Sequence, residues 1–523
     1  MRPKLDDPNR PDCKQCGKPM WIGKGKTVGG RTRYICGACA VSSTGSNESQ
    51  HNAGYDLDQA EQRVKNLKSK IKSGLRKFVI TAAQDTTNPY TLFFQSLKTY
   101  CQAEGAELII VPVHYKNVSL YTGNREYNKR WASDLEPFLI DAKVNLGGGV
   151  ILMGNIKVGA TAANPLEGMH SIGGDKTTIF GHSQLGMEPV ATPLNKKPKR
   201  MYTTGAVTRK NYSESKAGAK AEFHHVFGAL VVEIGKGNRA FIRQLNADND
   251  GGFYDLDKYY EPDRVTDGHR ALSLTAGDEH VKWMAKGVKK ATYTGQGSIT
   301  EVMRPNFIVR HDVFDAYAIS HHHEKDPLVQ YRKYAKGWGK AQTELEQVAD
   351  HINETTPPDC INLIVASNHH DHLKKWLDRA NANTDHQNAH LILELQKLMR
   401  EAVDGNEKPD PFELYLAPRL KHDTEFLDRN TPYLLKGVDH SQHGDVGVNG
   451  SRGSAKALAN TTHKLTIGHS HTARIVKSVY QTATSTGALE YQRGLSTHTN
   501  THVLQYPSGK RTLIDIINGQ WRA

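Results

Sequence analysis

Five short clusters of Asp, Asn, Glu and His occur between residues 270 and 472, and each follows an apolar run that is typical of a β-strand. Carboxylate, amide and imidazole groups bind divalent cations, and strand ends hold such groups in rigid positions. The clusters are Gly277-Asp278-Glu279-His280, His311-Asp312-Val313-Phe314-Asp315, Ser367-Asn368-His369-His370-Asp371, His443-Gly444-Asp445 and Gly468-His469-Ser470-His471. The pattern predicts a metal-dependent enzyme.

The strands expected to carry these clusters span residues 271–275, 307–309, 361–366, 433–435 and 465–467. In this order the clusters resemble the signature of the calcineurin-like metallophosphoesterases: D-x-H, G-D-x-x-D/H, G-N-H-D/E, a single H, and G-H-x-H. The resemblance extends from residue 278 to residue 471. It implies a two-sheet α/β/β/α sandwich over residues 266–523, with helices such as 331–352 and 385–403 outside and the ligands on loops at one edge of the sheets.

Carried over to this chain, the resemblance implies two divalent metal ions. One would be held by Asp278, His280, Asp312 and His471, and the other by Asp312, Asn368, His443 and His469. Asp312 would bridge the ions, because a shared carboxylate offsets the repulsion of cations roughly 3.5–4 Å apart. Mn²⁺ is the expected ion, although Zn²⁺, Fe or Co could use the same ligands.

His369 follows the expected ligand Asn368, and the resemblance implies that it is the catalytic residue, which stabilises the transition state or protonates the leaving oxygen. The chain departs from the signature at two positions, since His311 and Ser367 stand where the family usually has Gly. The single H could also be His440, but His443 is preferred because a Gly-rich run follows it. Taken singly, an Asp-x-His or His-x-His is more often a surface or core feature than a metal site.

Four cysteines form two pairs over residues 1–45, and two thiolates separated by two residues can share one tetrahedral ion. The pairs are Cys13-x2-Cys16 and Cys36-x2-Cys39. They predict a zinc ribbon or knuckle with one structural Zn²⁺; the alternative is four unrelated reduced thiols. Cys101 and Cys360 have no such partners and are expected to be buried apolar residues.

Residues 46–77 are expected to form a linker and a basic helix, with Val64, Leu67, Ile71 and Leu75 on one apolar stripe. Basic side chains crowd the remaining surface: Arg63, Lys65, Lys68, Lys70, Lys72, Arg76 and Lys77. They could contact a phosphate backbone, or they could form a solvated face.

Residues 78–265 are interpreted as a distinct α/β domain that begins with a β-α-β unit at residues 78–81, 90–101 and 108–113. Two Gly-rich stretches, residues 147–149 and 173–178, only superficially resemble phosphate loops. Neither contains the full fingerprint, so turns are expected there.

The net charge of +13 favours a polyanionic partner. The layout of cysteine knuckle, basic helix, α/β region and phosphoesterase signature resembles that of DNA-degrading enzymes of tailed bacteriophages, which implies DNA as substrate. Two alternatives stay open: a phosphatase or cyclic-nucleotide phosphodiesterase whose knuckle mediates assembly, and a DNA-binding or inhibitory protein with a vestigial metal site. The N-terminus lacks the apolar core of a signal peptide, so we expect a cytoplasmic protein, in the host if phage-encoded, with no membrane partner. A homo-oligomer stays open.

Overall fold

The computed structural model describes residues 57–85, 87–113, 131–194, 196, 198–489 and 492–523, together with two short strands, β1 (Trp21–Ile22) and β2 (Tyr34–Ile35). These two strands pair antiparallel. The zinc-knuckle cysteines Cys13, Cys16, Cys36 and Cys39 lie outside the described residues. No helix among the described residues is long and apolar enough to cross a membrane.

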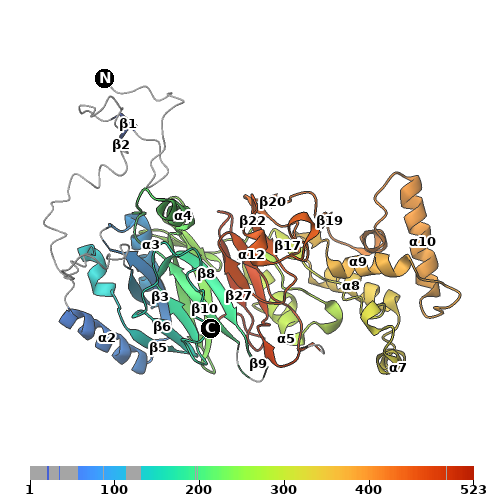
Figure 1. Ribbon diagram of the computed structural model, residues 1–523, viewed down its shortest axis with the longest axis horizontal. Helices are drawn as coiled ribbons and strands as arrows, with labels where there is room; N and C mark the ends of the chain where they lie inside the picture. The colour runs from blue at the N-terminus through green and yellow to red at the C-terminus, as the bar shows by residue number, and fades with distance from the viewer. Residues whose placement is uncertain are drawn as a thin grey trace.

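The chain has a mixed α/β fold with several sheets, and it opens with the expected basic helix and β-α-β unit (Figure 1). Helix α2 (Leu57–Lys72) is followed by β3 (Lys77–Gln84), α3 (Thr91–Glu104) and β4 (Glu107–Val113). Strands β3 and β4 are parallel, as predicted. They form a four-stranded sheet of order β12-β11-β3-β4 with β11 (Gly228–Gly235) and β12 (Arg239–Asn246).

The largest sheet has ten strands in the order β20-β21-β22-β24-β23-β8-β10-β7-β6-β5. One half comes from early residues: β5 (Lys143–Gly147), β6 (Val150–Met153), β7 (Thr177–Phe180), β8 (His182–Val190) and β10 (Lys199–Gly205). The other half comes from late residues: β20 (Leu434–Leu435), β21 (Val438–Asp439), β22 (Lys464–Ile467), β23 (Arg474–Val476) and β24 (Val479–Gln481). The halves join where Ile475 of β23 pairs with Met187 of β8.

The prediction of a separate α/β domain over residues 78–265 therefore needs a correction. The ten-stranded sheet crosses the boundary predicted near residue 265, and one apolar core contains residues from both sides, among them Ile80, Met187 and Val503. Side-chain bonds also join the two parts, since the amide of Gln244 in β12 donates to Thr512 at 2.9 Å. Local apolar patterns predict where strands form, but pairing between distant strands depends on tertiary packing.

A six-stranded sheet of order β19-β18-β17-β16-β26-β27 carries three of the predicted clusters. Its strands are β16 (Ser273–Thr275), β17 (Phe307–Arg310), β18 (Ile361–Val365), β19 (Thr424–Leu427), β26 (Thr501–Gln505) and β27 (Arg511–Asp515). Val503 and Leu513 pack toward the ten-stranded sheet, whereas Leu504 and Ile514 pack in a second core with the short helices α5 (Lys286–Lys289) and α6 (Ile299–Met303).

Helices cover the outside of this region, as Figure 1 shows for α7 to α10. They are α7 (Pro327–Lys336), α8 (Ala341–Thr355), α9 (Asn368–Leu377), α10 (Ala389–Asp404) and α11 (Pro411–Leu416), and the short α12 (Ala455–Leu458) packs on β23 and β24. The helix predicted over 331–352 is two helices, because Gly337 adopts a left-handed conformation with φ 67° and ends α7. The smaller elements are α4 (Lys216–His224), β13 (Phe253–Asp255), β14 (Lys258–Tyr260), β15 (Val265–Thr266), β9 (Thr192–Pro193) and β25 (Leu495–Ser496).

Candidate metal centre

The first three clusters meet because they follow neighbouring parallel strands. Strand β16 pairs with β17, and β17 pairs with β18, so their carboxyl ends lie at one edge of the six-stranded sheet. Asp278, Asp312 and Asn368 come just after these ends. The ten-stranded sheet supplies the rest, since His443 follows β21 and His469 follows β22, which are also parallel neighbours. The site therefore lies where the edges of two sheets meet.

Four residues form a compact group that could hold a metal ion: Asp278, His280, Asp312 and His471. One ligand atom from each lies within 4.8 Å of the others, and all four side chains are buried. Nε2 of His280 is 3.0 Å from Nε2 of His471, and Nε2 of His471 is 3.4 Å from Oδ2 of Asp278. These are the residues that the sequence assigned to the first ion.

The residues expected around a second ion lie next to this group. Nε2 of His443 is 3.0 Å from Oδ2 of Asp312, and the ring centroids of His443 and His469 are 5.2 Å apart. Asn368, Asp312 and His469 line the same cavity. The two predicted ligand groups thus meet at Asp312, because Nε2 of His280 and Nε2 of His443 lie 3.8 and 3.0 Å from the same oxygen, Oδ2.

Buried oxygen atoms show that this site fits cations. Both carboxylate oxygens of Asp278, Oδ1 of Asp312 and Oδ1 of Asn368 are buried and have no hydrogen-bond partner among the described residues. A buried carboxylate without a partner is costly, and a bound cation removes that cost. The donor set of carboxylate, amide and imidazole groups is one that Mn²⁺, Zn²⁺ and Fe accept.

The backbone is strained at four of the expected ligands. His280, Asp312, His469 and His471 have φ of 34°, 44°, 77° and 54°, a region that residues with a Cβ seldom occupy. Such strain persists only where surrounding contacts enforce it, and it concentrates at functional sites. Gly468 is required here for another reason, because a Cβ on it would lie 2.3 Å from Oδ1 of Asp278.

The two departures from the signature have structural explanations. Ser367 is the N-cap of α9, where its hydroxyl accepts from the amide of His370, so Asn368 becomes the first residue of that helix. His311 is buried with its Nδ1 3.2 Å from Nδ1 of His443, and it packs behind an expected ligand. Both substitutions leave Asn368 and Asp312 at the site.

Electrostatics within the site are dominated by burial and by mutual contact. Burial and the nearby Asp312 raise the pKa of Asp278 to about 7. Burial would also raise the pKa of Asp312, but His443 and His369 hold it well below its usual range. Burial and the neighbouring His280 lower the pKa of His471 well below its usual value, which keeps this imidazole neutral, the form that binds metal.

Asp315 is a contributor that received no role from the sequence, although it belongs to the second cluster. Its Oδ1 lies 2.8 Å from Nδ1 of His280, and its Oδ2 accepts from Nε1 of Trp283 at 2.9 Å. A carboxylate behind a metal-binding imidazole orients the ring and raises its basicity. Its spacing of three residues from Asp312 is the signal that could have identified it.

The alternative candidate His440 lies elsewhere. Its Nε2 contacts Oε1 of Gln505 at 2.7 Å, and burial lowers its pKa to about 4.

His369 is half-buried, lines the cavity, and has its Nδ1 2.8 Å from the carbonyl oxygen of Asp315. The His321–His323 turn is a short 3₁₀ helix that contributes no residue to the four-residue group.

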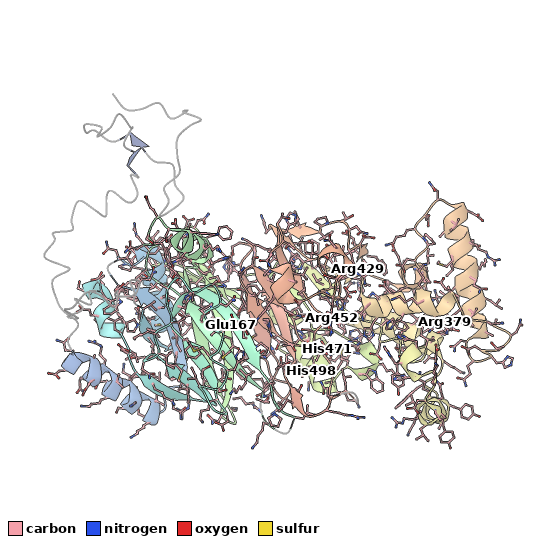
Figure 2. All side chains as sticks on the ribbon, viewed as in Figure 1. Glu167, Arg379, Arg429, Arg452, His471 and His498 are labelled. Atoms are coloured by element: carbon pink, nitrogen blue, oxygen red, sulfur yellow. The ribbon has the colours of Figure 1, made fainter. Side chains whose placement is uncertain are left out.

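A cavity of about 620 Å³ is lined by five residues of the candidate site, namely Asp312, Asn368, His369, His469 and His471. Its wall also contains Arg452, Lys456 and Arg474, cationic side chains that sequence reasoning missed because nothing in the local pattern places them there. Figure 2 shows Arg452, His471 and His498, three residues of this cavity, close together near the middle of the molecule. Cationic side chains beside a metal site suit an anionic substrate.

The predicted nucleic-acid contacts divide into two groups. Lys77 lies in β3 rather than in the helix, where its Nζ is 2.7 Å from both Glu104 and Glu233, so it is engaged internally. Arg63 donates to the carbonyl of Leu139, and Lys70 is 2.8 Å from Glu107. Lys65, Lys68, Lys72 and Arg76 are exposed, while the apolar stripe of α2 packs on the core through Leu67. These four remain candidates for DNA contact.

The chain is similar in sequence to a bacteriophage protein. The chain is 33% identical to protein A1 of Escherichia phage T5 over 472 residues, which cover 87% of this chain and 84% of that protein. The chain belongs to the protein A1 family. No protein-family model and no solved structure matches it. The evidence for a metal site in this member of the A1 family is therefore the geometry of its own Asp and His side chains.

Proposed function

We propose that this A1-family protein is a phosphodiesterase that cleaves DNA, with two divalent cations, Mn²⁺ foremost, at the site around Asp312. One observation carries the proposal: among the described residues, buried oxygens of Asp278, Asp312 and Asn368 have no hydrogen-bond partner, and Asp312 and Asn368 line an open cavity together with His469 and His471. The six-stranded sheet packs toward the ten-stranded sheet through Val503 and Leu513, with helices outside, and this supports a metallophosphoesterase sandwich whose sheets also include strands from before residue 266. Kinship with a phage protein favours action in the host cytoplasm.

Two cations held there would lower the pKa of a bound water and neutralise charge on the phosphoryl oxygens. The remaining tasks belong to the chain. Asp312 is the carboxylate that both ligand groups can share, because Nε2 of His280 and Nε2 of His443 both approach its Oδ2. Arg452, Lys456 and Arg474 line the cavity and attract the phosphate.

His369 is the residue that we assign to the leaving oxygen. Its Nδ1 faces a carbonyl oxygen, which can only accept, so Nδ1 carries a proton and Nε2 is the atom free to exchange one with substrate. General acid catalysis of this kind contributes about a hundredfold or more.

The experiment compares linear DNA, circular DNA and bis(4-nitrophenyl) phosphate, each with Mn²⁺ or with EDTA. DNA cleavage that requires Mn²⁺, is abolished in Asp312→Ala and falls about a hundredfold in His369→Ala supports the proposal. His386→Ala, on an exposed loop, is the matched control and should cleave normally. Cleavage of the aryl ester with DNA left intact would instead indicate a phosphodiesterase for small substrates. DNA binding without turnover of any substrate would indicate a vestigial site.

A further inference from the structure

Two further cavities neighbour the metal-centre cavity. A second one, of about 240 Å³, shares His498 with it, and a third, of about 800 Å³, shares His498, Thr499 and Asn500 with the second. Thr192, Pro193 and Lys196 also line both the second and the third. His498 thus borders all three neighbouring cavities, which are together called the groove.

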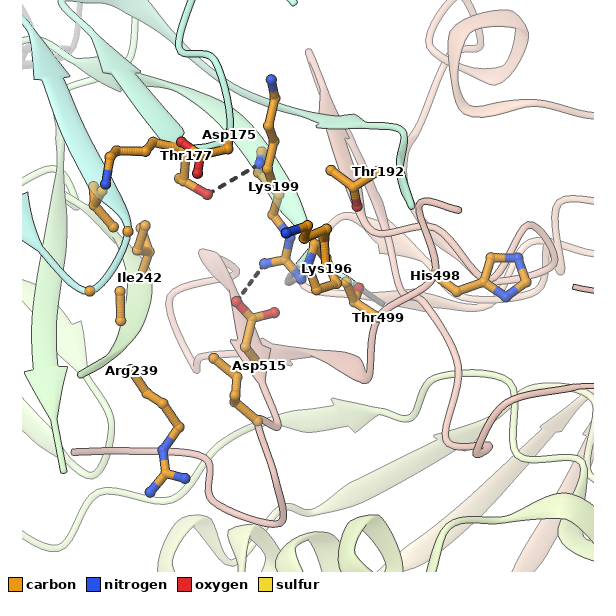
Figure 3. A pocket seen from close by; sticks show the side chains of 18 of the residues that line it. Asp175, Thr177, Thr192, Lys196, Lys199, Arg239, Ile242, His498, Thr499 and Asp515 are labelled. Carbon is orange, nitrogen blue, oxygen red and sulfur yellow. Dashed lines mark hydrogen bonds and ion pairs between the residues drawn. The ribbon is translucent and has the colours of Figure 1, made fainter. Parts of the chain in front are cut away.

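The far cavity lies between the early and late halves of the chain, where Figure 3 shows Arg239 and His498 at opposite ends. Its wall includes two Gly-rich turns, through Gly148 and Gly149 and through Gly174 to Thr177. These are the two stretches that superficially resemble phosphate loops in the sequence. Turns form there as expected, since Gly148 and Gly149 connect the antiparallel strands β5 and β6 and residues 173–176 form the turn before β7. Both turns expose backbone next to the same cavity.

Basic side chains predominate in this far cavity. Lys176, Lys196 and Arg239 line it, and Nε of Arg239 is buried without a hydrogen-bond partner among the described residues. Lys199 and Arg200 lie deeper in the wall. The two acidic groups are Asp175 and Asp515, and Asp515 is already paired with Arg200. The cavity therefore carries a net positive charge that is suited to phosphate groups.

Apolar side chains complete the wall, among them Ile242, Ile516 and Pro198. Unpaired bases can be removed from water against such a surface, whereas the bases of a duplex are already stacked inside it. Proteins that bind single strands combine a basic groove that follows the backbone with aromatic side chains that stack on the bases, and Tyr202 and His498 supply rings in the lining of this cavity. The middle cavity, of about 240 Å³, is the smallest of the three.

We propose that this groove holds a single DNA strand that extends from the metal centre, with phosphates on Lys196, Lys176 and Arg239. The inference rests on the proposed nuclease function and adds the strand type and its path. His498, which lines both the metal-centre cavity and the second cavity, marks the point where the strand leaves the metal centre. The groove thereby makes affinity depend on strand length, because only a longer strand reaches Lys176 and Arg239.

The test measures binding of fluorescently labelled DNA in EDTA by anisotropy, at several salt concentrations. The double variant Lys176→Gln/Lys196→Gln is expected to bind a single strand of about ten nucleotides roughly tenfold more weakly than wild type. The slope of log binding constant against log salt concentration should become shallower by about 0.7 for each lost phosphate contact. Its affinity for a dinucleotide should not change. Lys336→Gln, an exposed lysine on α7, is the matched control and should behave as wild type.

Unchanged affinity of the double variant for the longer strand would overturn the inference. An equal loss with a duplex of the same sequence would overturn the assignment to a single strand. The nuclease proposal is tested separately. DNA cleavage by wild type with Mn²⁺ supports the nuclease proposal even if the groove variants bind normally. An absence of both DNA binding and cleavage in wild type would overturn both proposals.

Discussion

Oδ1 of Asp315 lies 2.8 Å from Nδ1 of His280, while Nε2 of the same ring lies 3.0 Å from Nε2 of His471 in the metal group. Burial alone would lower the pKa of His280, but the bond to Asp315 raises it to about 9. The carboxylate therefore holds the ring so that Nε2 of His280 points toward the other residues of the metal group.

Asp315→Asn should weaken Mn²⁺ binding by about 10- to 100-fold, because the amide holds the ring less firmly and leaves it less basic. Calorimetric titration of metal-free protein measures this affinity. Asp378→Asn, an exposed carboxylate beside Lys374, is the control. An affinity in Asp315→Asn equal to that of wild type would show that Asp315 does not position His280.

Asp278→Asn should have opposite effects on thermal stability with and without metal. In EDTA the variant is expected to melt at a higher temperature than wild type, because it removes a buried carboxylate whose oxygens have no hydrogen-bond partner among the described residues. Excess Mn²⁺ should reverse the order, since binding at a hundred times Kd stabilises wild type by about 2.7 kcal/mol. Melting curves measured by circular dichroism check both. The same order in both conditions would contradict a metal site that includes Asp278.

Arg310→Met should destabilise the protein by about 3–5 kcal/mol, because it leaves the fully buried Glu279 without its cation. The guanidinium of Arg310 lies 3.0 Å from Oε1 of Glu279 and donates to Asn362 at 2.9 Å. Glu279 lies within the first cluster and Arg310 directly precedes the second, so the pair couples the strand ends that present Asp278 and Asp312. Urea unfolding measures the change. Arg310→Met/Glu279→Met should be more stable than the single variant, and a lower stability would refute the pairing argument.

Ionisation of Glu344 should lower the free energy of unfolding as pH rises from 4.5 to about 7. Burial, with the nearby charge of Asp315, raises the pKa of Glu344 from 4.5 to about 7, while its carboxylate accepts from the amides of Tyr317 and Ala318. Between these values the folded state binds more protons than the unfolded state, so this group's stabilising contribution is complete below pH 4.5 and is lost up to about pH 7. The loss amounts to about 3 kcal/mol.

Glu344→Gln, which cannot ionise, should therefore gain stability relative to wild type as pH rises from 4.5 to 7, and the difference should be constant above that range. Melting temperatures across this range measure the difference. A difference that does not change with pH would mean that Glu344 ionises normally in the folded protein.

Much of the candidate site could be predicted from local sequence, because strand ends and ligand types are local properties. The strands before Asp278, Asp312, Asn368 and His469 form within a few residues of their predicted bounds. The predicted strand pair β3 and β4 is also parallel, because a helix of the right length separates two apolar runs. In contrast, the break at Gly337 depends on one residue in a long helical pattern.

The sequence by itself determined that acid, amide and imidazole groups follow several apolar strands, and it determined their order. Only the tertiary structure decided that these groups meet at one point, that His443 rather than His440 reaches Asp312, and that Ile475 pairs with Met187 to join two parts expected to be separate. The reason is physical. Backbone propensity and side-chain periodicity act over a few residues, whereas the choice of strand partner and the shape of a cavity depend on packing between residues hundreds of positions apart.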